Sequence, residues 1–538
     1  MLENLTSDTI SAGTVDLGNT PKTVIAFPYS GDYRIDVLLA GANNKWAPDL
    51  AAGQTRTVTF SFAQTAAYLS GANYTEERKG LTPFTQAEKA ATRAIFAYIG
   101  TVLPITFTEV TETSAANTAV GDIRLANNDQ DSAGYALYPV GDDAQLKGDV
   151  FLANSAIGNA YVAGSYDYDT VLHEISHALG LKHPGNYNAG SAPSTEPGNY
   201  LATSEDSKTL SVVSYAEHAQ GLQRVDFAPY DLLALKYLYG LKAQNVGNNT
   251  YAWTDSIGGQ LQTLVDDGGQ DTIDLRKITT PTTIDLREGH SSSAGLTGQY
   301  AITSGIPAEQ NVQIAFGTVI EAVVGSDQAD QIIGNAGNNT FEGRGGNDHL
   351  DGGDGLDTAV WAGNAAQYKI SPTATGYAVQ SLSSAEGTDQ LQNMERLRFS
   401  DESVALDLSG NAGTTAKILG AVFGQSAVSN KQFVGIGLHY LDDLGYSYPG
   451  LVQLAITAAL GAAPSNEQVV DLLYTNLVGK APDAATRQNY VDLLKYGTFT
   501  VASLGVLAAD TELNKTNIKL VGSSSLVQTG LEYLPFSG

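Results

Sequence analysis

The chain is 538 residues long, enough for three or four domains, and contains 57 acidic residues, 29 basic residues and no cysteine. A net charge of −28 argues against a nucleic-acid partner, because phosphate contacts need clustered lysine and arginine. No run of eighteen apolar residues occurs, so we expect no membrane span, and the lack of cysteine excludes disulfides.

Residues 1–25 are polar and aperiodic, and we interpret them as an N-terminal tail or a short prosegment. The first eight residues have neither a basic n-region nor an apolar h-region. We therefore expect no cleavable Sec signal peptide.

Residues 26–245 mix strand and helix patterns, which predicts an α+β domain. The apolar residues at every second position of 58–62 are typical of a half-buried strand. Thr85 and Glu88 have the spacing of a capping box, which predicts a helix that continues to about Ile99.

One short run in this domain, HEISHALGLKH, is the most informative pattern of the chain. His173 and His177 stand four positions apart, so on a helix both imidazoles project from one face and can share a metal ion. Glu174 follows the first histidine, where a carboxylate can take a proton from a metal-bound water. Gly180 lets the helix end and the chain turn sharply, which brings back His183 as a third nitrogen ligand.

Three protein ligands leave a fourth tetrahedral position open for water, as a catalytic zinc requires and a structural zinc does not. The alternative is an ordinary amphipathic helix with core or surface histidines. Because the chain has only seven histidines, three at these offsets with the glutamate and the glycine are a coincidence on the order of 10⁻⁵. We therefore predict a zinc site at His173, His177 and His183, on a helix whose N-cap is Asp169 or Thr170.

The zinc motif resembles that of the metzincin clan of zinc proteases, and the residues around it are similar to the serralysin family. The similar runs are PGNYNAG at 184–190, EDS at 205–207, SVVSY at 211–215 and the helix-like segment 229–240. The resemblance covers roughly residues 30 to 360 and implies a secreted zinc endopeptidase that acts on proteins or peptides.

The resemblance also implies roles for single residues. Glu174 would be the general base, and Tyr215 matches the tyrosine that can coordinate zinc at rest and then stabilise the oxyanion. A buried tyrosine without a chemical role is the alternative for Tyr215. The methionine of the family's turn below the zinc is replaced by Val213, for which we expect a modest loss of packing. Residues 134–140 would be the edge strand along which a substrate peptide pairs.

Residues 246–410 are rich in glycine, aspartate, asparagine and threonine, and they contain a nine-residue repeat that begins at Gly325, Gly334, Gly343 and Gly352. The pattern is that of the RTX parallel β-roll, in which the sixth residue ligates Ca²⁺ and the aliphatic eighth residue points into the core. The alternative is a flexible Gly/Asp-rich linker. The predicted calcium ligands of the repeats are Asp330, Asn339, Asp348 and Asp357.

Two further segments resemble calcium loops of the same family. Asp266 and Asp271 lie in an acidic Gly-rich turn, and Glu321 precedes the first repeat. We predict that these three carboxylates also ligate calcium, with an exposed acidic turn as the alternative for each segment.

The repeats also indicate whether the protein folds inside or outside the cell. Calcium is scarce in bacterial cytosol and abundant outside, so a chain that needs it for folding can fold once it is exported. RTX proteins generally leave Gram-negative cells by type I secretion, which fits the missing N-terminal signal. We predict an extracellular or cell-surface-associated protein.

Residues 411–538 have helical periodicity, with five predicted helices between residues 416 and 494. The segment 469–483 resembles a helical module of RTX-type secreted proteins. Docking to a cell-surface or surface-layer partner, assistance of export and capping of the roll all remain open, and we favour docking.

The sequence thus predicts a multidomain α+β protein. It comprises a metzincin-like zinc protease domain, a central RTX β-roll and an all-α C-terminal module. The cofactors would be Zn²⁺ and several Ca²⁺ ions. The alternative function is a surface-binding RTX protein whose protease domain is weakly active or inactive, for which Val213 and the C-terminal extension are the only support.

Overall fold

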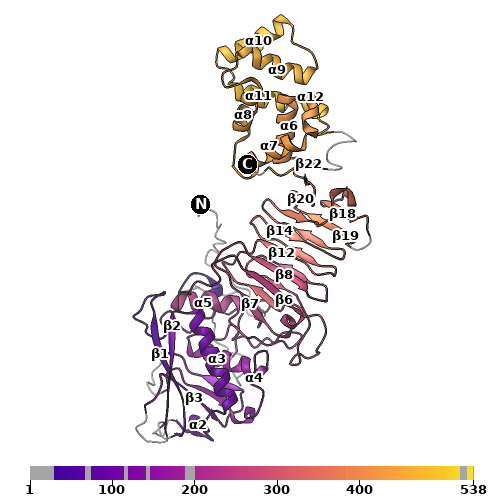
Figure 1. The fold of residues 1–538 in the computed structure, drawn as a ribbon. Helices are drawn as coiled ribbons and strands as arrows, with labels where there is room; N and C mark the ends of the chain where they lie inside the picture. Colours follow the sequence, from indigo (N-terminus) through magenta and orange to yellow (C-terminus); the bar gives the residue numbers. More distant parts are fainter. Residues whose placement is uncertain are drawn as a thin grey trace. The chain divides into compact units, whose positions relative to one another are not determined.

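The computed structural model describes residues 29–66, 69, 74–113, 119–140, 146–187, 200–383, 386–521 and 530–536. The predicted tail or prosegment lies outside these ranges, as do the last three residues of the run PGNYNAG. The chain forms two compact units, residues 1–271 with 277–319 and residues 272–276 with 320–538. Figure 1 shows the elements of both units. The domain boundaries expected from the sequence stay predictions.

The first unit is built on a five-stranded sheet with the order β2-β1-β3-β5-β4. Neighbouring strands are parallel, except that β4 runs antiparallel to β5 and forms one edge of the sheet. The strands are β1 (Arg56–Phe62), β2 (Ile105–Val110), β3 (Ile123–Asn128), β4 (Gly134–Ala136) and β5 (Val150–Ala153). The predicted edge segment 134–140 therefore does lie at an edge, although only its first three residues form a strand.

Two long helices, α3 and α4, pack against the hydrophobic core of this unit (Figure 1). The predicted capping box of Thr85 and Glu88 is present and begins α3, which continues three residues beyond Ile99. The helices of the unit are α1 (Tyr33–Asp36), α2 (Thr75–Arg78), α3 (Gln86–Val102), α4 (Tyr166–Ala178) and α5 (Pro229–Tyr239), with the 3₁₀ turn η3 (Asn154–Ala156).

The remainder of the first unit consists of short strands. Three of them form a small sheet with the order β10-β11-β7. The elements are β6 (Thr250–Thr254), η4 (Asp255–Gly259), β7 (Gln262–Leu264), β9 (Thr283–Asp285), β10 (Ser291–Ser292) and β11 (Val312–Ile314).

The second unit begins with a roll of parallel strands in two sheets, with the orders β8-β12-β14-β16-β20-β21-β22 and β13-β15-β19-β18-β17. In the repeats, each residue pairs with the residue 18 positions later, so that two nonapeptides make one coil. The pairs that involve β17, β18, β21 and β22 are antiparallel. The strands are β8 (Thr272–Lys277), β12 (Ala322–Val324), β13 (Gln331–Ile333), β14 (Thr340–Glu342), β15 (His349–Asp351), β16 (Thr358–Val360), β17 (Tyr368–Pro372), β18 (Tyr377–Ser381), β19 (Thr388–Gln392), β20 (Arg396–Arg398), β21 (Ser403–Ala405) and β22 (Leu531–Tyr533), with the 3₁₀ turn η5 (Ala365–Gln367).

The eighth residues of the four repeats fill the interior of the roll. Ile332, Phe341, Leu350 and Ala359 are all buried, with at most 1% of each residue exposed. Their strand neighbours are less buried, because successive side chains of a strand point to opposite faces. The predicted β-roll is confirmed and a flexible linker is excluded.

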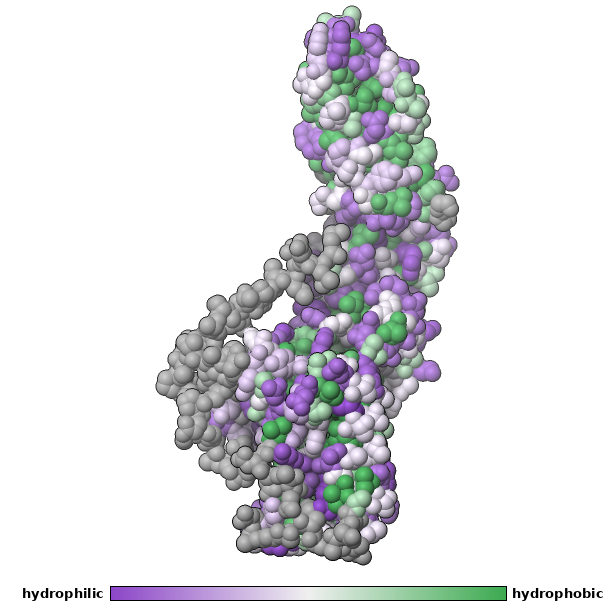
Figure 2. Space-filling model, turned by 90° about the vertical axis from the view of Figure 1, so that its left-hand side faces the viewer, coloured by the Kyte–Doolittle hydropathy of each residue, from purple (hydrophilic) through white to green (hydrophobic). Residues whose placement is uncertain are grey.

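The C-terminal helices have two hydrophobic clusters of their own. The five predicted helices are present, and two more, α11 and α12, follow them. An apolar groove of about 390 Å³ is lined by residues of α6, α7 and α8, and Figure 2 shows hydrophobic residues gathered on the surface of the helical part. The helices are α6 (Asn411–Phe423), α7 (Lys431–Asp442), α8 (Tyr448–Leu460), α9 (Asn466–Val478), α10 (Ala484–Lys495), α11 (Val501–Ala509) and α12 (Glu512–Asn517), with the 3₁₀ turn η6 (Gln425–Ser429).

Among the described residues, no helix is both long enough and apolar enough to cross a bilayer.

The buried repeat positions give a test of the roll. We expect Phe341→Ala to destabilise it by about 3–5 kcal/mol, because truncation of a fully buried phenylalanine loses transfer free energy and leaves a cavity. Scanning calorimetry in calcium buffer should show this loss in the transition of the roll. Gln331→Ala, which truncates an exposed side chain of β13, is the matched control and should change little. An unchanged transition for Phe341→Ala would contradict the packing.

Candidate metal centre

Helix α4 carries the first two histidines of the motif. It begins one turn earlier than expected: the N-cap is Ser165, whose hydroxyl accepts a hydrogen bond from the Tyr168 amide. The predicted N-cap at Asp169 or Thr170 is therefore wrong. Asp169 is buried within the first helical turn, where its carboxylate forms an ion pair with Lys208, a partner 39 residues away. A distant partner of this kind leaves no signal in the local sequence.

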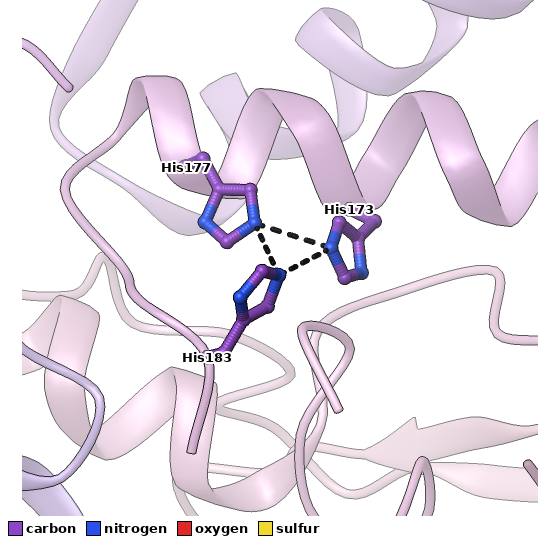
Figure 3. A group of neighbouring side chains, drawn as sticks. All are labelled: His173, His177 and His183. Carbon is purple, nitrogen blue, oxygen red and sulfur yellow. Dashed lines mark hydrogen bonds between the residues drawn. The ribbon is translucent and has the colours of Figure 1, made fainter. Parts of the chain in front are cut away.

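Gly180 ends the helix as the motif predicts. Its φ is +103°, in the region that favours glycine, and a Cβ atom there would lie 2.0 Å from the Asn44 carbonyl oxygen. The chain can therefore turn closely past this carbonyl. The turn returns His183 to the face of α4 that carries His173 and His177 (Figure 3).

The three imidazoles meet at their Nε2 atoms. The Nε2 of His177 lies 3.1 Å from that of His173 and 3.0 Å from that of His183, and the third distance is 3.2 Å. Within the described part of the chain, this is the one group of three or more His or carboxylate side chains close enough to hold a metal ion.

Two backbone carbonyls determine which nitrogens face each other. The Nδ1 of His173 lies 3.0 Å from the Val212 oxygen, and the Nδ1 of His177 lies 2.7 Å from the Leu181 oxygen. A carbonyl can only accept, so each Nδ1 carries the proton and each Nε2 presents a lone pair. Burial lowers the pKa of His177 to about 4 and that of His173 well below its usual value. Converging neutral nitrogens fit a tetrahedral zinc ion.

Glu174 is buried beside the edge strand. A Cβ atom at Gly134 would lie 2.9 Å from the Glu174 Cγ, so strand β4 passes directly along this side chain. The Oε2 of Glu174 has no hydrogen-bond partner among the described residues. Burial raises the pKa of Glu174 to about 8. A carboxyl group with a pKa near neutrality can take up a proton and release it again.

Tyr215 lies over the histidines and is 40% exposed, so it is not the buried tyrosine of the alternative reading. The centroid of its ring lies 4.4 Å from that of His183 and 5.6 Å from that of His173. Tyr187 holds it in place: its hydroxyl accepts from the Tyr215 amide at 2.9 Å and donates to Asp206 at 2.9 Å. Burial raises the pKa of Tyr215, which keeps its hydroxyl protonated as a donor.

Asp231 organises the turn that carries Val212 and Val213, and sequence reasoning did not single it out because its partners in that turn lie 19 and 20 residues away. One oxygen of its buried carboxylate accepts from the Ser211 hydroxyl at 2.7 Å, and the other accepts from the amides of Val212 at 2.8 Å and Ala228 at 2.9 Å. The same turn supplies the carbonyl that orients His173. Val213, which replaces the family's methionine, is fully buried in the hydrophobic core.

In the roll, the sixth residues of the repeats form two ladders. The Asp330 amide donates to Asp348 Oδ1 at 2.9 Å, and the Asn339 amide donates to Asp357 Oδ1 at 2.7 Å. All four residues are buried. The second oxygens of Asp348 and Asp357 have no hydrogen-bond partner among the described residues. Buried, unpaired carboxylate oxygens at glycine turns are a donor set that calcium suits.

Asp389 and Glu395 continue these ladders, and sequence reasoning missed both. The Asp348 amide donates to Asp389 Oδ1 at 3.1 Å, and the Asp357 amide donates to Glu395 Oε2 at 2.9 Å. Both residues lie outside the nine-residue repeat, after the hairpin of β17 and β18. Asp389 lies within β19 and Glu395 directly before β20, and each precedes a residue, Gln390 or Arg396, that pairs with the residue after a repeat ligand.

The other predicted calcium ligands lie apart from the repeats. Asp266 and Asp271 are buried, with hydrogen bonds from Tyr251 to Asp266 at 2.5 Å and from the Asn249 amide to Asp271 at 2.7 Å. An exposed acidic turn is thus excluded for this pair. Glu321 is partly buried, and its backbone carbonyl accepts from the Thr340 amide at 2.8 Å. Calcium ligation by these three residues stays a prediction.

The stability of the roll should depend on both calcium and pH. Without calcium, burial raises the pKa of Asp348 to about 8 and that of Asp357 to about 7, above the value of about 3.9 in an unfolded chain. The folded state then binds more protons, so this contribution to stability is present at acidic pH and is lost as the pH rises toward 8.

We therefore expect the calcium-free melting temperature of the roll to fall between about pH 5 and pH 8. Saturating calcium should raise the melting temperature at pH 7.5 and weaken its pH dependence, because the ion replaces the protons. Scanning calorimetry in EGTA and in calcium measures both effects. A melt at neutral pH that does not respond to calcium would contradict the site.

Comparisons with known proteins agree with the repeats. Residues 324–359 match the family model described as the RTX calcium-binding nonapeptide repeat, in four copies. Serralysin G of Dickeya chrysanthemi is 29% identical over 352 residues, which cover 61% of this chain and 68% of that protein.

Two further relatives are similar. Serralysin of Proteus mirabilis is 28% identical over 334 residues, 56% of this chain and 64% of that protein. Metalloprotease AprA of Pseudomonas entomophila is 29% identical over 288 residues, 48% of this chain and 56% of that protein. The chain thus spans between about half and two thirds of the length of these relatives. Together with the RTX repeats, the matches support the assignment of this chain to the serralysin family.

Proposed function

We propose that this chain is a secreted, calcium-stabilised zinc endopeptidase that cleaves peptide bonds of extracellular or cell-surface proteins. The observation that carries the proposal is the convergence of three histidine Nε2 atoms next to a buried carboxyl group whose Oε2 has no hydrogen-bond partner among the described residues. Relatives named serralysin and metalloprotease support the same activity.

His173, His177 and His183 would hold the zinc ion. Zinc bound by three nitrogens lowers the pKa of water toward about 7 and polarises a carbonyl group. Glu174 would take the proton of the attacking water and return it to the leaving amine. Its position between the histidines and strand β4 suits both transfers.

Tyr215 would stabilise the oxyanion. Its ring stacks over His173, its backbone is held by Tyr187, and its hydroxyl stays protonated at neutral pH. A donor that is held in place before the reaction costs little reorganisation as negative charge develops.

Strand β4 would bind the substrate. It forms one edge of the five-stranded sheet and has β5 on one side. An extended peptide that adds to this edge would pass Glu174, whose side chain packs against Gly134 in the space that a Cβ atom would fill. The substrate class is therefore a peptide in an extended conformation.

Export would precede folding of the roll. Calcium outside the cell stabilises the folded state by mass action, whereas a calcium-poor cytosol leaves the repeats loose. The division into a catalytic domain, a roll and a helical module, and the docking role of that module, stay predictions. The alternative of an inactive binding protein is not favoured, because the three ligands and the base are brought together.

Replacement of Glu174 gives the direct test of the reaction. Glu174→Gln should retain zinc, because the histidines are untouched, and lower the turnover of a peptide substrate by about 10² or more. Zinc content by mass spectrometry and kcat with a fluorogenic peptide measure the two effects. Glu109→Gln, a change of the same kind on the outer strand β2, is the control and should leave both unchanged. Near wild-type turnover of Glu174→Gln would remove this residue from the role.

A further inference from the structure

A cavity of about 320 Å³ lies next to the histidines. It is lined by His173 and Glu174 and also by three charged side chains that the proposed reaction does not use, Asp169, Lys208 and Glu217. Asp169 lies on α4, one turn before His173, whereas the other two flank the turn that ends at Tyr215. A substrate side chain beside the scissile bond would reach these charges.

Lys208 cannot bind an acidic substrate side chain. Its ammonium group has three donor hydrogens, and it contacts three acceptors: Asp169, Glu217 at 3.0 Å and Gln223 at 2.8 Å. Only 5% of the Lys208 side chain is exposed. A carboxylate from a substrate would have to break one of these buried bonds.

The carboxylates still have acceptor capacity. The Oδ1 of Asp169 is buried and has no hydrogen-bond partner among the described residues. Only 2% of this side chain is exposed. The side chain of Glu217 is 48% exposed at the cavity, while its Oε2 accepts one hydrogen bond, from Gln223 at 3.0 Å. Two carboxylates against one ammonium give the three groups a net charge of −1.

We propose that this cavity binds the substrate side chain next to the scissile bond and that Asp169 and Glu217 select lysine or arginine there. The proposal rests on the proposed function and narrows its substrate class to proteins cleaved beside a basic residue. A cationic donor meets the exposed carboxylate of Glu217 with the buried charge of Asp169 behind it, and charge-assisted hydrogen bonds to such a carboxylate are the strong ones. An apolar side chain would make no such bond, and an acidic side chain would be repelled by the net charge of −1.

A purely structural role is the competing explanation, in which the ion pair only ties residues 208–217 to α4. Substrate preference distinguishes the two. The full-length protein, loaded with zinc and calcium, is tested on peptides that differ only at the two positions flanking the scissile bond, with lysine, arginine, norleucine or glutamate at either one.

At one of the two positions we expect kcat/KM for lysine or arginine to exceed that for norleucine by about tenfold or more, with glutamate lowest. Glu217→Gln should lower the ratio of lysine to norleucine by about threefold or more, and Asp169→Asn should lower it further. Asp167→Asn is the matched control: it removes the same charge from the same helix at a residue that does not line this cavity. Its ratio should equal that of the wild type.

The outcomes separate this inference from the proposed function. If the wild type cleaves the peptides but prefers norleucine or glutamate, or shows no preference, the cavity assignment is overturned and the protease proposal stands. Cleavage of none of the peptides overturns both. A normal preference for basic residues in Glu217→Gln and Asp169→Asn assigns the ion pair a structural role. If Asp169→Asn does not fold, as judged by its melt, Glu217→Gln decides alone.

Discussion

Two imidazole N–H groups that donate to backbone carbonyls underlie the whole site. The bonds from His173 to Val212 and from His177 to Leu181 place the protons of these two residues on Nδ1 and leave their Nε2 lone pairs facing the Nε2 atom of His183, with all three Nε2 atoms within 3.2 Å of one another. Such lone pairs repel, and only a cation at their centre turns the repulsion into binding. The three nitrogens therefore converge because the fold supplies two acceptors, one inside the motif run at Leu181 and one 39 residues from His173 at Val212, which the motif itself does not reveal.

The acceptor for His173 belongs to a turn that several distant groups hold in place. Asp231 on α5 binds the backbone of that turn, and the chain then continues to Tyr215, which Tyr187 positions over the histidines. The same segment places Glu217 in the cavity beside the metal site. One turn thus orients His173, positions Tyr215 and contributes the charge of Glu217 to the cavity, so the proposed chemistry and the proposed selectivity depend on the same segment.

The sequence predicted what fixed spacing controls. The HExxH offsets bring two histidines to one face because the helical period is local, and the nonapeptide repeats predict the roll because each unit repeats one backbone geometry. Long-range partners could not be predicted. The carboxylate of Asp169 does not cap the helix, because it pairs with a lysine far along the chain, and the helix begins earlier than expected. Asp389 continues a ladder of the roll after a hairpin that breaks the repeat.

X-ray absorption spectroscopy at the zinc edge tests the central claim most directly. For the full-length protein with one bound zinc ion, we expect a first shell that contains three imidazole nitrogens at about 2.0–2.1 Å, with the remaining ligands oxygen. Replacement of His177 by alanine should remove one imidazole from that shell. A shell with fewer than three imidazoles in the wild type, or one made of oxygen alone, would contradict the account.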